Sequence, residues 1–538
     1  MKKYLYVILL LWCSHTIATA QCSKRYTQRT FNSIQKFEDV VYSQNAPTLL
    51  AASITTETTY SKDLVMDIFM PPVSDTVTKR PVVILAHGGG FINVAFMGGT
   101  SLVGTMDNED VQALADTLAH WGYVTASIEY RLGFNVLSPS SLKRAVWRGS
   151  QDMSAAIRFF RKNAAWFDID PDRVFSGGSS AGALCALHAT FVDDSERMPE
   201  SREITPIIKR DLGALHSRPV VELTGTNPFV GNNVLGNDVD SLPIGIAAYW
   251  GAIADNDWLH QGNNKAPVIL FHGSSDLIVP YKCGRPFSGV ILTAPDMCGS
   301  YVMDSIMTQY NMPHEFYTGA GEGHEYWGVL NGNWLPNGPN AYWQDIINKT
   351  GNYFHRIMKP QAPQIVAADT IAAGTNATFS IANPIAGHSY CWEVQGGVIT
   401  SPVTNGSTIT VQFYNTVSQG FVTARSIDQA EVASDQQLAI ATVVSPVSTT
   451  SIKQTITAIR LQPNPATNYC VLEIQAQKST TAQLQISNVL GQVLWQQESN
   501  LIAGQNTVNL SIEHLPKGNY MVRVQVGEEH SVQQLVRL

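Results

Sequence analysis

A serine stands between two glycines in the run Gly178-Ser179-Ser180-Ala181-Gly182, directly after an apolar segment. Val174–Ser176 is typical of a short buried strand, and Ala181–Leu187 is typical of a helix packed on a sheet. A serine at so sharp a strand-to-helix turn needs neighbours without bulk, because its backbone is strained. The pattern predicts that Ser180 Oγ stands above a sheet edge as a nucleophile. Taken alone, the pentapeptide is more typical of a tight glycine turn.

A second apolar segment, Pro81–Ala86, runs into His87-Gly88-Gly89-Gly90. Consecutive glycines let the backbone approach a ligand closely and leave N–H groups free to point at a developing oxyanion. A flexible loop without a function is the alternative interpretation. The presence of both the glycine run and the serine turn in one chain favours a catalytic role for the glycine run. His87 is more plausible as a hydrogen-bond partner that orients this loop than as a base.

Together these loops resemble those of α/β-hydrolase esterases and lipases, in particular the hormone-sensitive-lipase-like and carboxylesterase-like branches with an HGGG loop. The similarity extends over roughly residues 40–355. Three further segments carry it: Glu129–Leu132, Asn163–Phe167 and Asp170–Val174. The resemblance implies a doubly wound α/β fold with a mostly parallel sheet. It also implies an oxyanion hole formed by the N–H groups of Gly89, Gly90 and Ala181.

The resemblance predicts an acid and a histidine downstream of the serine. Asp276 follows the apolar strand Val268–Phe271, and His324 follows the strand-like Glu315–Tyr317. Both lie in loops after strands, on the side where parallel sheets collect their sites. We expect His324 to take the Ser180 proton and return it to the leaving alcohol. Asp276 would orient the imidazole and stabilise its charged form.

Other residues of the same types are weaker candidates, because they lie on a predicted helix, at a strand end or farther from one. They are His188, His272, His314, Asp296 and Asp304. Glutamate is the usual acid of the cholinesterase-like branch. An aspartate in the run Asp276–Pro280 instead resembles short bacterial esterases and prolyl-oligopeptidase-type peptidases.

Composition and the N-terminus predict an exported protein of several domains. The 538 residues are too many for one core, and the net charge of −8 argues against nucleic acid as a partner. Lysines, an apolar run from Tyr4 to Cys13 and Ala18-Thr19-Ala20 indicate a signal peptide over residues 1–20. The apolar run is too short for a membrane anchor, so we expect no transmembrane segment.

Export makes disulfides possible among the cysteines that remain after cleavage. These are Cys22, Cys185, Cys283, Cys298, Cys391 and Cys470. Cys283 and Cys298 bracket one loop and form the best candidate pair; closing a loop of about 15 residues contributes roughly 3 kcal/mol. Cys185 is expected to be a small buried packing residue. The spacings predict no zinc site, and no nucleotide-binding loop is present, so neither a metal nor a cofactor is expected.

The pattern changes after Met358, where helical periodicity ends and short alternating strands begin. Residues 364–444, with strands such as Tyr390–Val394 and Thr408–Phe413, resemble an immunoglobulin-like or PKD-like β-sandwich. A linker, Ser445–Ser451, then leads to a last small β module.

That module, residues 456–538, resembles the C-terminal sorting domain of the type IX secretion system. Three motifs carry the resemblance in order: Pro463-Asn464-Pro465, Leu490-Gly491 and Lys517-Gly518-Asn519-Tyr520. It implies passage through the periplasm, with the secretion machinery as a partner, and release or anchorage at the cell surface. A substrate-binding β module is the alternative.

The sequence therefore predicts an exported serine carboxylic-ester hydrolase, with its catalytic domain over residues 21–358. Acetyl or feruloyl polysaccharide esters, lipid esters and polyesters are all candidate substrates. We expect the acyl pocket and a lid in Phe91–Asn108 and Asp193–Asn237, with Phe96 and Met97 among the walls. A serine peptidase, and a catalytically silent surface-binding protein on a hydrolase scaffold, are the alternatives.

Overall fold

The chain divides into two compact units. The first runs to Ala362 and includes two later segments, Ile385–Ser389 and Ser426–Asp435; the second holds the other residues from Pro363 onward. The computed structural model describes residues 22, 24–50, 58–93, 103–193, 196–199, 212–225, 227–259, 266–287, 294–444 and 455–538. The predicted signal peptide, the Ser445–Ser451 linker, Phe96 and Met97 lie outside the described residues.

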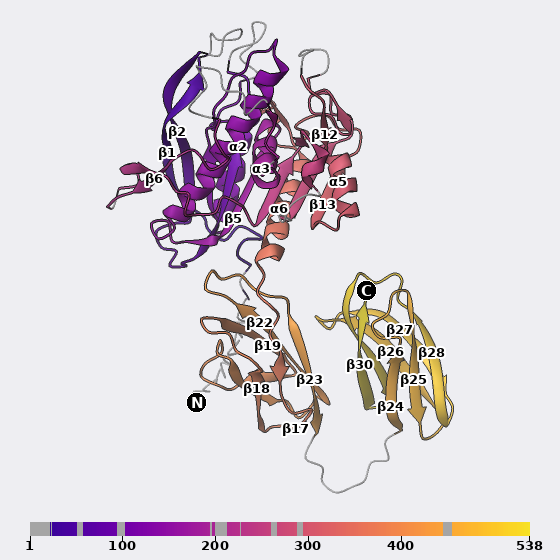
Figure 1. Cartoon of the computed structure of the whole chain (residues 1–538). Helices are drawn as coiled ribbons and strands as arrows, with labels where there is room; N and C mark the ends of the chain where they lie inside the picture. The colour runs from indigo at the N-terminus through magenta and orange to yellow at the C-terminus, as the bar shows by residue number, and fades with distance from the viewer. Residues whose placement is uncertain are drawn as a thin grey trace, which may run out of the picture. The chain divides into compact units, whose positions relative to one another are not determined.

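The first unit is built on an eight-stranded sheet (Figure 1) in the order β1-β2-β4-β3-β5-β8-β10-β13. Its strands are β1 (Gln35–Leu49), β2 (Thr59–Met70), β3 (Arg80–Ala86), β4 (Val124–Ile128), β5 (Ile169–Ser179), β8 (Gly245–Tyr249), β10 (Val268–Gly273) and β13 (His314–Gly319). β1, β2 and β4 pair antiparallel, and the strands from β4 to β13 are parallel. The predicted α/β-hydrolase fold is thus confirmed.

The helices of this unit pack on both faces of the sheet. They are α1 (Glu109–His120), α2 (Pro139–Lys162), α3 (Ala181–Phe191), the short η1 (Asn256–Leu259), α5 (Ser300–Gln309) and α6 (Ala341–Met358). At the start of α2, Ser138 Oγ accepts a hydrogen bond from the Ser141 N–H, and Pro139 is the first helical residue. The serine supplies an acceptor for an N–H that has no partner in the helix, and proline already has the helical φ angle.

Alternation along the strands separates two hydrophobic cores. Val82 and Ile84 of β3 pack with α2 and α3, and Val83 and Leu85 pack with α1 and α6. β3 is buried at every position, as expected for a strand covered on both faces. Because both faces of the sheet are covered, a polar site is expected at the carboxyl ends of the strands, where the loops emerge.

Short strands complete the first unit: β6 (Val220–Leu223), β7 (Gly231–Val234), β9 (Ala252–Ile253), β11 (Cys283–Gly284), β12 (Met297–Gly299), β14 (Val329–Leu330) and β15 (Asn333–Trp334). β11 and β12 carry the disulfide Cys283–Cys298, whose Cα atoms are 4.0 Å apart. Cys185 is free and buried, as expected, and Cys470 is also free. Cys22 and Cys391, for which the sequence predicted no pairing, are disulfide-bonded.

The second unit is all β. Its first pair of sheets has the orders β16-β18-β21-β20 and β17-β23-β22-β19, and its second pair β24-β25-β28 and β27-β26-β29-β30. The first set of strands is β16 (Ile365–Val366), β17 (Thr370–Ala372), β18 (Asn376–Ile381), β19 (Ser389–Gln395), β20 (Gly397–Ile399), β21 (Thr408–Phe413), β22 (Gln419–Ile427) and β23 (Gln437–Val444). The second set is β24 (Ile456–Gln462), β25 (Tyr469–Ala476), β26 (Thr480–Asn488), β27 (Val493–Leu501), β28 (Gly504–Ser511), β29 (Gly518–Val526) and β30 (Glu529–Arg537). Each set encloses its own apolar cluster, which accounts for the two predicted small β domains.

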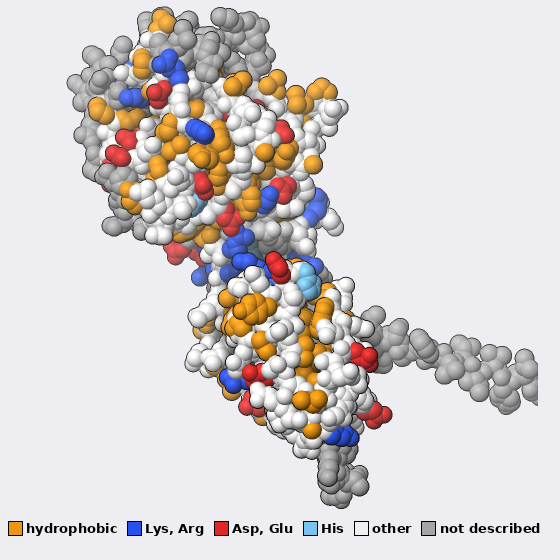
Figure 2. Space-filling view, turned by 90° about the vertical axis from the view of Figure 1, so that its right-hand side faces the viewer, with side chains coloured by type: hydrophobic (Ala, Val, Ile, Leu, Met, Phe, Trp, Pro, Cys, Tyr) orange, Lys and Arg blue, Asp and Glu red, His pale blue; other side chains and the backbone are white. Residues whose placement is uncertain are grey.

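On the face of the molecule shown in Figure 2, basic and acidic side chains are interspersed with apolar ones. Among the described residues, no helix is long and apolar enough to cross a membrane.

The segment Ser426–Asp435 packs into the first unit although it follows residue 358. Ala430 and Val432 are buried in the core cluster that contains α1 and α6, and the Tyr26 hydroxyl donates to the Ala430 carbonyl at 2.7 Å. Arg173 also pairs with Asp428 at 2.6 Å. We therefore propose that a stable catalytic piece needs this segment in addition to residues 21–358.

Val432→Ala should destabilise the first unit by roughly 1–3 kcal/mol, because it removes buried methyl groups from that unit's core. The matched change Val403→Ala, at a side chain that is 55% exposed, should leave the unit's stability unchanged. Urea denaturation followed by tryptophan fluorescence and by loss of ester hydrolysis measures both. Equal stabilities for the two variants would contradict the packing role of the segment.

Candidate active site

Ser180 occupies a strained turn between β5 and α3. Its backbone has φ 53° and ψ −115°, a conformation that is rare for residues other than glycine. The Ser180 N–H donates to the Tyr249 carbonyl at 2.9 Å. A Cβ on Gly182 would lie 2.0 Å from the Ala86 carbonyl oxygen. Only glycine fits there, so the glycine requirement predicted for the turn has a steric cause.

His324 and Asp276, predicted from separate loops, are joined by a hydrogen bond. His324 Nδ1 and Asp276 Oδ2 are 2.6 Å apart, so the ring donates through Nδ1–H and its Nε2 is left as an acceptor. Asp276 Oδ1 accepts from the N–H groups of Ile278 and Val279 at 2.8 and 3.0 Å. This is the arrangement that a histidine base and its orienting carboxylate require.

A second histidine holds the same carboxylate. His272 Nε2 lies 3.2 Å from Asp276 Oδ2, and its Nδ1 lies 2.9 Å from the Ser300 hydroxyl. The His272 side chain is fully buried, whereas that of His324 is 12% exposed. Burial alone would raise the pKa of Asp276, but its hydrogen bonds with His272 and His324 hold that pKa below the ordinary value. Sequence reasoning placed His272 at a strand end and missed this contact, since β10 and its loop must fold back to create it.

Trp250 links the serine turn to the histidine. Its indole Nε1–H donates to Ser179 Oγ at 2.9 Å, and its ring meets the His324 ring edge-on at 6.2 Å between centroids. Ser179 stands at the position before the serine that is variable in the G-x-S-x-G pattern. The structure gives its hydroxyl a buried partner instead, so an alanine there would leave the Trp250 N–H without an acceptor.

The glycine loop lies against the same centre. A Cβ on Gly88 would lie 3.4 Å from Glu325 Oε1 and 3.5 Å from Ser179 Oγ. The loop is therefore in contact with the residue that follows His324 and with the residue that precedes Ser180.

Gly90 has φ 61°, and a Cβ there would lie 2.5 Å from Phe287 Cζ. This position accepts only glycine, for reasons of both backbone conformation and space.

His87 holds the glycine loop through a hydrogen bond and a ring contact. Its Nδ1–H donates to the Gly88 carbonyl at 2.6 Å, and its ring stacks on Tyr130 at 4.4 Å. The Tyr130 hydroxyl donates to the His87 carbonyl at 2.9 Å. Burial lowers the pKa of His87 to about 4, so the ring stays neutral near pH 7. These contacts match the orienting role expected for His87.

The N–H groups predicted to bind the oxyanion have no competing acceptor within the part of the chain that the structure describes. None of those on Gly89, Gly90 and Ala181 donates to another described residue. Ala181 is the first residue of α3, and the first N–H groups of a helix lack partners within the helix. Donors at a helix start also carry partial positive charge, which favours an anion.

Two buried carboxyl groups beside this loop were not predicted. Glu325 Oε2 accepts from the Asn331 N–H. Asp110 is fully buried at the start of α1, and its own N–H donates to the Gly332 carbonyl at 3.0 Å. Burial raises the pKa of Glu325, and burial together with nearby Glu325 raises that of Asp110 well above its usual value. The sequence carries no signal for them, since acidic residues in loops and first turns are ordinarily exposed.

The rival histidines and aspartates have other partners or lie elsewhere. His188 Nδ1–H donates to the Leu184 carbonyl at 2.7 Å, while its Nε2 accepts from the Ala254 N–H. His314 pairs with Asp304 at 3.1 Å. Asp296 is exposed. Of these candidates, only His272 contacts Asp276.

Comparisons with known proteins match two parts of the chain. Residues 66–226 match the family model described as BD-FAE. Residues 460–537 match the model described as a secretion system C-terminal sorting domain, which confirms the type IX sorting module predicted from the sequence. The chain is accordingly secreted or displayed at the cell surface.

Individual relatives match only part of the chain. Carboxylesterase 3B of Mus musculus is 34% identical over 122 residues, 22% of this chain and 19% of that protein. Juvenile hormone esterase of Heliothis virescens is 31% identical over 160 residues, 29% of this chain and 26% of that protein. The chain thus spans about a fifth to a quarter of these relatives. Among solved structures, propionate-bound esterase 2 of Thermogutta terrifontis matches with a TM-score of 0.35 and 18% identity, over 58% of this chain and 95% of that one.

Asp276→Asn should lower kcat by about 10⁴-fold, because an amide in place of the carboxylate favours the wrong tautomer of His324. Asp304→Asn is the matched control, since it alters the other Asp–His pair of the same unit, at 3.1 Å. Steady-state hydrolysis of p-nitrophenyl acetate measures both. Similar losses of kcat in the two variants would contradict a specific role of the Asp276–His324 pair in the reaction.

Acidification should destabilise the protein between about pH 6.5 and pH 4. Burial lowers the pKa of His188, like that of His87, to about 4 in the folded chain. In this window the unfolded chain binds protons that the folded chain does not, so stability rises with pH, by at most about 1.4 kcal/mol per unit for each histidine. The contribution is complete above pH 6.5 and is lost as pH falls towards 4. His188→Asn should show a shallower slope in urea denaturation at pH 4.5, 5.5 and 6.5; an unchanged slope would contradict this account.

Proposed function

We propose that this protein is an exported serine carboxylic-ester hydrolase that uses Ser180, His324 and Asp276. The observation that carries the proposal is the 2.6 Å contact between His324 Nδ1 and Asp276 Oδ2. It leaves His324 Nε2 as an acceptor in a loop that shares Trp250 as a neighbour with the Ser180 turn. The BD-FAE match of residues 66–226, which span the glycine loop and the serine turn, supports the same reaction class.

The proposed mechanism proceeds in two half-reactions. His324 takes the Ser180 proton as Oγ attacks the ester carbonyl, and returns it to the leaving alcohol. The N–H groups of Gly89, Gly90 and Ala181 would bind the oxyanion, each donor contributing roughly 10²–10³ in rate. Water, activated by His324, then hydrolyses the acyl-enzyme. Asp276 stays ionised throughout and stabilises the imidazolium.

Export directs the proposal towards extracellular esters. The sorting domain at residues 460–537 supports a substrate outside the cell, and polysaccharide acyl esters, lipid esters and polyesters are the candidates. The curated relatives named as esterases agree in reaction class. Hydrolysis rates on acetylated xylan, methyl ferulate, tributyrin and polyester film would distinguish these substrates.

Two other functions are distinguished from ester hydrolysis by the experiment below. A serine peptidase would use the same three residues, and a silent surface-binding protein would use none of them. The close packing of the Ser180 turn against Ala86 favours an enzyme, because strain held by surrounding structure is typical of functional sites.

Ser180→Ala should abolish hydrolysis of p-nitrophenyl esters and labelling by a fluorophosphonate, while the fold is retained. Oγ supplies the covalent step. Its removal deletes one atom from a buried position, which is a small change to the packing. Ser179→Ala, the matched control, should still be labelled, with a partial loss of rate from its broken bond to Trp250. Labelling of Ser180→Ala would place the nucleophile elsewhere. Turnover of a peptide but not of esters would favour the peptidase, and no labelling of the unmodified protein would favour the silent scaffold.

A further inference from the structure

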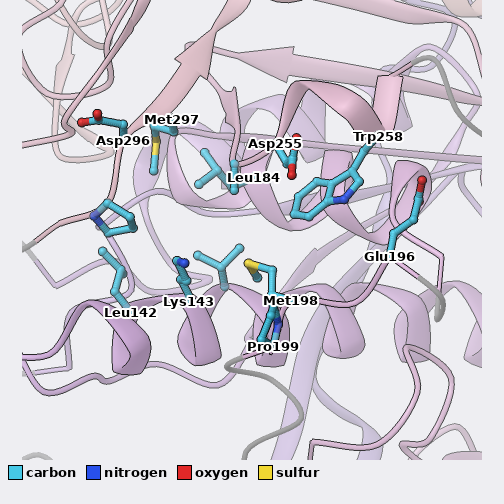
Figure 3. A pocket seen from close by; sticks show the side chains of 13 residues that line it. Leu142, Lys143, Leu184, Glu196, Met198, Pro199, Asp255, Trp258, Asp296 and Met297 are labelled. Carbon is cyan, nitrogen blue, oxygen red and sulfur yellow. The ribbon is translucent and has the colours of Figure 1, made fainter.

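A cavity of about 230 Å³ opens beside α3 in the first unit. Its inner wall is apolar and includes Val146, Leu184, Met198 and Trp258, each at most 8% exposed. Figure 3 shows Leu184, Met198 and Trp258 with acidic side chains around them. The cavity differs from the wall predicted in Phe91–Asn108, although Met198 belongs to the predicted lid segment.

The cavity lies close to the proposed reaction centre. The Leu184 N–H donates to the Ser180 carbonyl at 3.2 Å, and one helical turn of four residues advances about 6 Å. Part of the remaining wall comes from α2 and from residues 196–199. The rest comes from residues that follow Trp250 and from residues at the start of β12, and Ile253 of β9 is paired with Cys298 of β12. The segments that form the reaction centre therefore continue into the walls of the cavity.

The walls indicate which part of an ester the cavity receives. His324 must reach the leaving alcohol oxygen in order to protonate it, so the alcohol lies beside the His324 loop. Among the described residues, none from that loop lines the cavity. The cavity is therefore on the acyl side of the ester.

The charges around the cavity indicate what kind of acyl group fits. Among the described lining residues, three are acidic (Glu196, Asp255 and Asp296) and one is basic (Lys143). An apolar wall favours burial of methylene or aromatic groups. A carboxylate at the far end of the acyl group would meet like charge at the rim, and such charges repel by about 0.5 kcal/mol each across 8 Å of water.

We propose that this cavity is the acyl subsite of the enzyme, and that its acidic rim selects uncharged acyl groups over anionic ones. The proposal rests on the ester hydrolysis proposed above. It assigns to Leu184, Val146, Met198 and Trp258 the binding of an apolar acyl chain, and to Asp296 a part in excluding a terminal carboxylate.

The test uses two acyl groups of equal length, in p-nitrophenyl pentanoate and the mono-p-nitrophenyl ester of glutaric acid. Asp296→Lys should raise the glutarate-to-pentanoate ratio of kcat/KM about fivefold at low ionic strength, since it changes the rim by two charges. The gain should shrink in 0.5 M salt. Asp172→Lys makes the same change at another exposed aspartate of this unit and should leave the ratio as it is. An unchanged ratio in Asp296→Lys, or an equal change in Asp172→Lys, would overturn the proposal.

A second variant tests the apolar wall. Val146→Phe should fill the cavity and lower kcat/KM for the pentanoate at least tenfold relative to the acetate, because only the longer chain needs the space. Equal effects on both esters would exclude an acyl role for the cavity. If circular dichroism shows that Val146→Phe does not fold, the surface variant Asp296→Lys still decides. Failure of the unmodified protein to hydrolyse even p-nitrophenyl acetate would instead refute the proposed function.

Discussion

The backbone of the Ser180 turn packs so closely against the end of β3 that a Cβ on Gly182 would overlap the Ala86 carbonyl, at 2.0 Å, and one on Gly178 would lie 2.5 Å from the same oxygen. This approach keeps the serine at φ 53° and lifts it above the sheet. The strain is tolerated because β3 and β5 are buried in the middle of an eight-stranded sheet whose two faces are filled. The rest of the proposed site depends on this fixed edge, since the glycine loop, Asp276 and His324 all lie in loops.

Those loops are held to one another by buried polar contacts. Asp276 accepts from two backbone N–H groups and lies beside two histidines, which is enough to keep a carboxylate ionised in a buried place. Trp250 couples the serine turn to His324, and Glu325 lies against the glycine loop. These contacts hold the loops in fixed positions relative to one another, and the proposed reaction would benefit because preorganised groups stabilise a transition state electrostatically.

The proposed active site and the secretion signal lie in different units of the chain. The sorting domain has its own apolar cluster and belongs entirely to the second unit, whereas Ser426–Asp435 of the preceding β region is part of the first unit. Secretion and catalysis can thus vary independently at the C-terminus, but the boundary between the first two predicted domains is less clean than the change in composition at Met358 indicates. Buried aliphatic side chains such as Val432, rather than the covalent order of the segments, decide where the unit ends.

The sequence by itself determined the parts that depend on local chemistry. The glycines around Ser180, the glycine loop after β3, and the loops of Asp276 and His324 could be predicted because turns of this kind restrict residue type and because parallel strands bring their carboxyl ends together. Only the tertiary structure decided which side chains meet. The bond from Trp250 to Ser179 and the packing of Val432 on distant helices join residues far apart in the chain. The contact of His272 with Asp276, only four residues on, depends on how the loop after β10 folds back, and the burial of Glu325 and Asp110 depends on what packs around them. The periodicity of apolar residues predicts which face of a helix or strand is buried, but it does not predict which residues pack against that face.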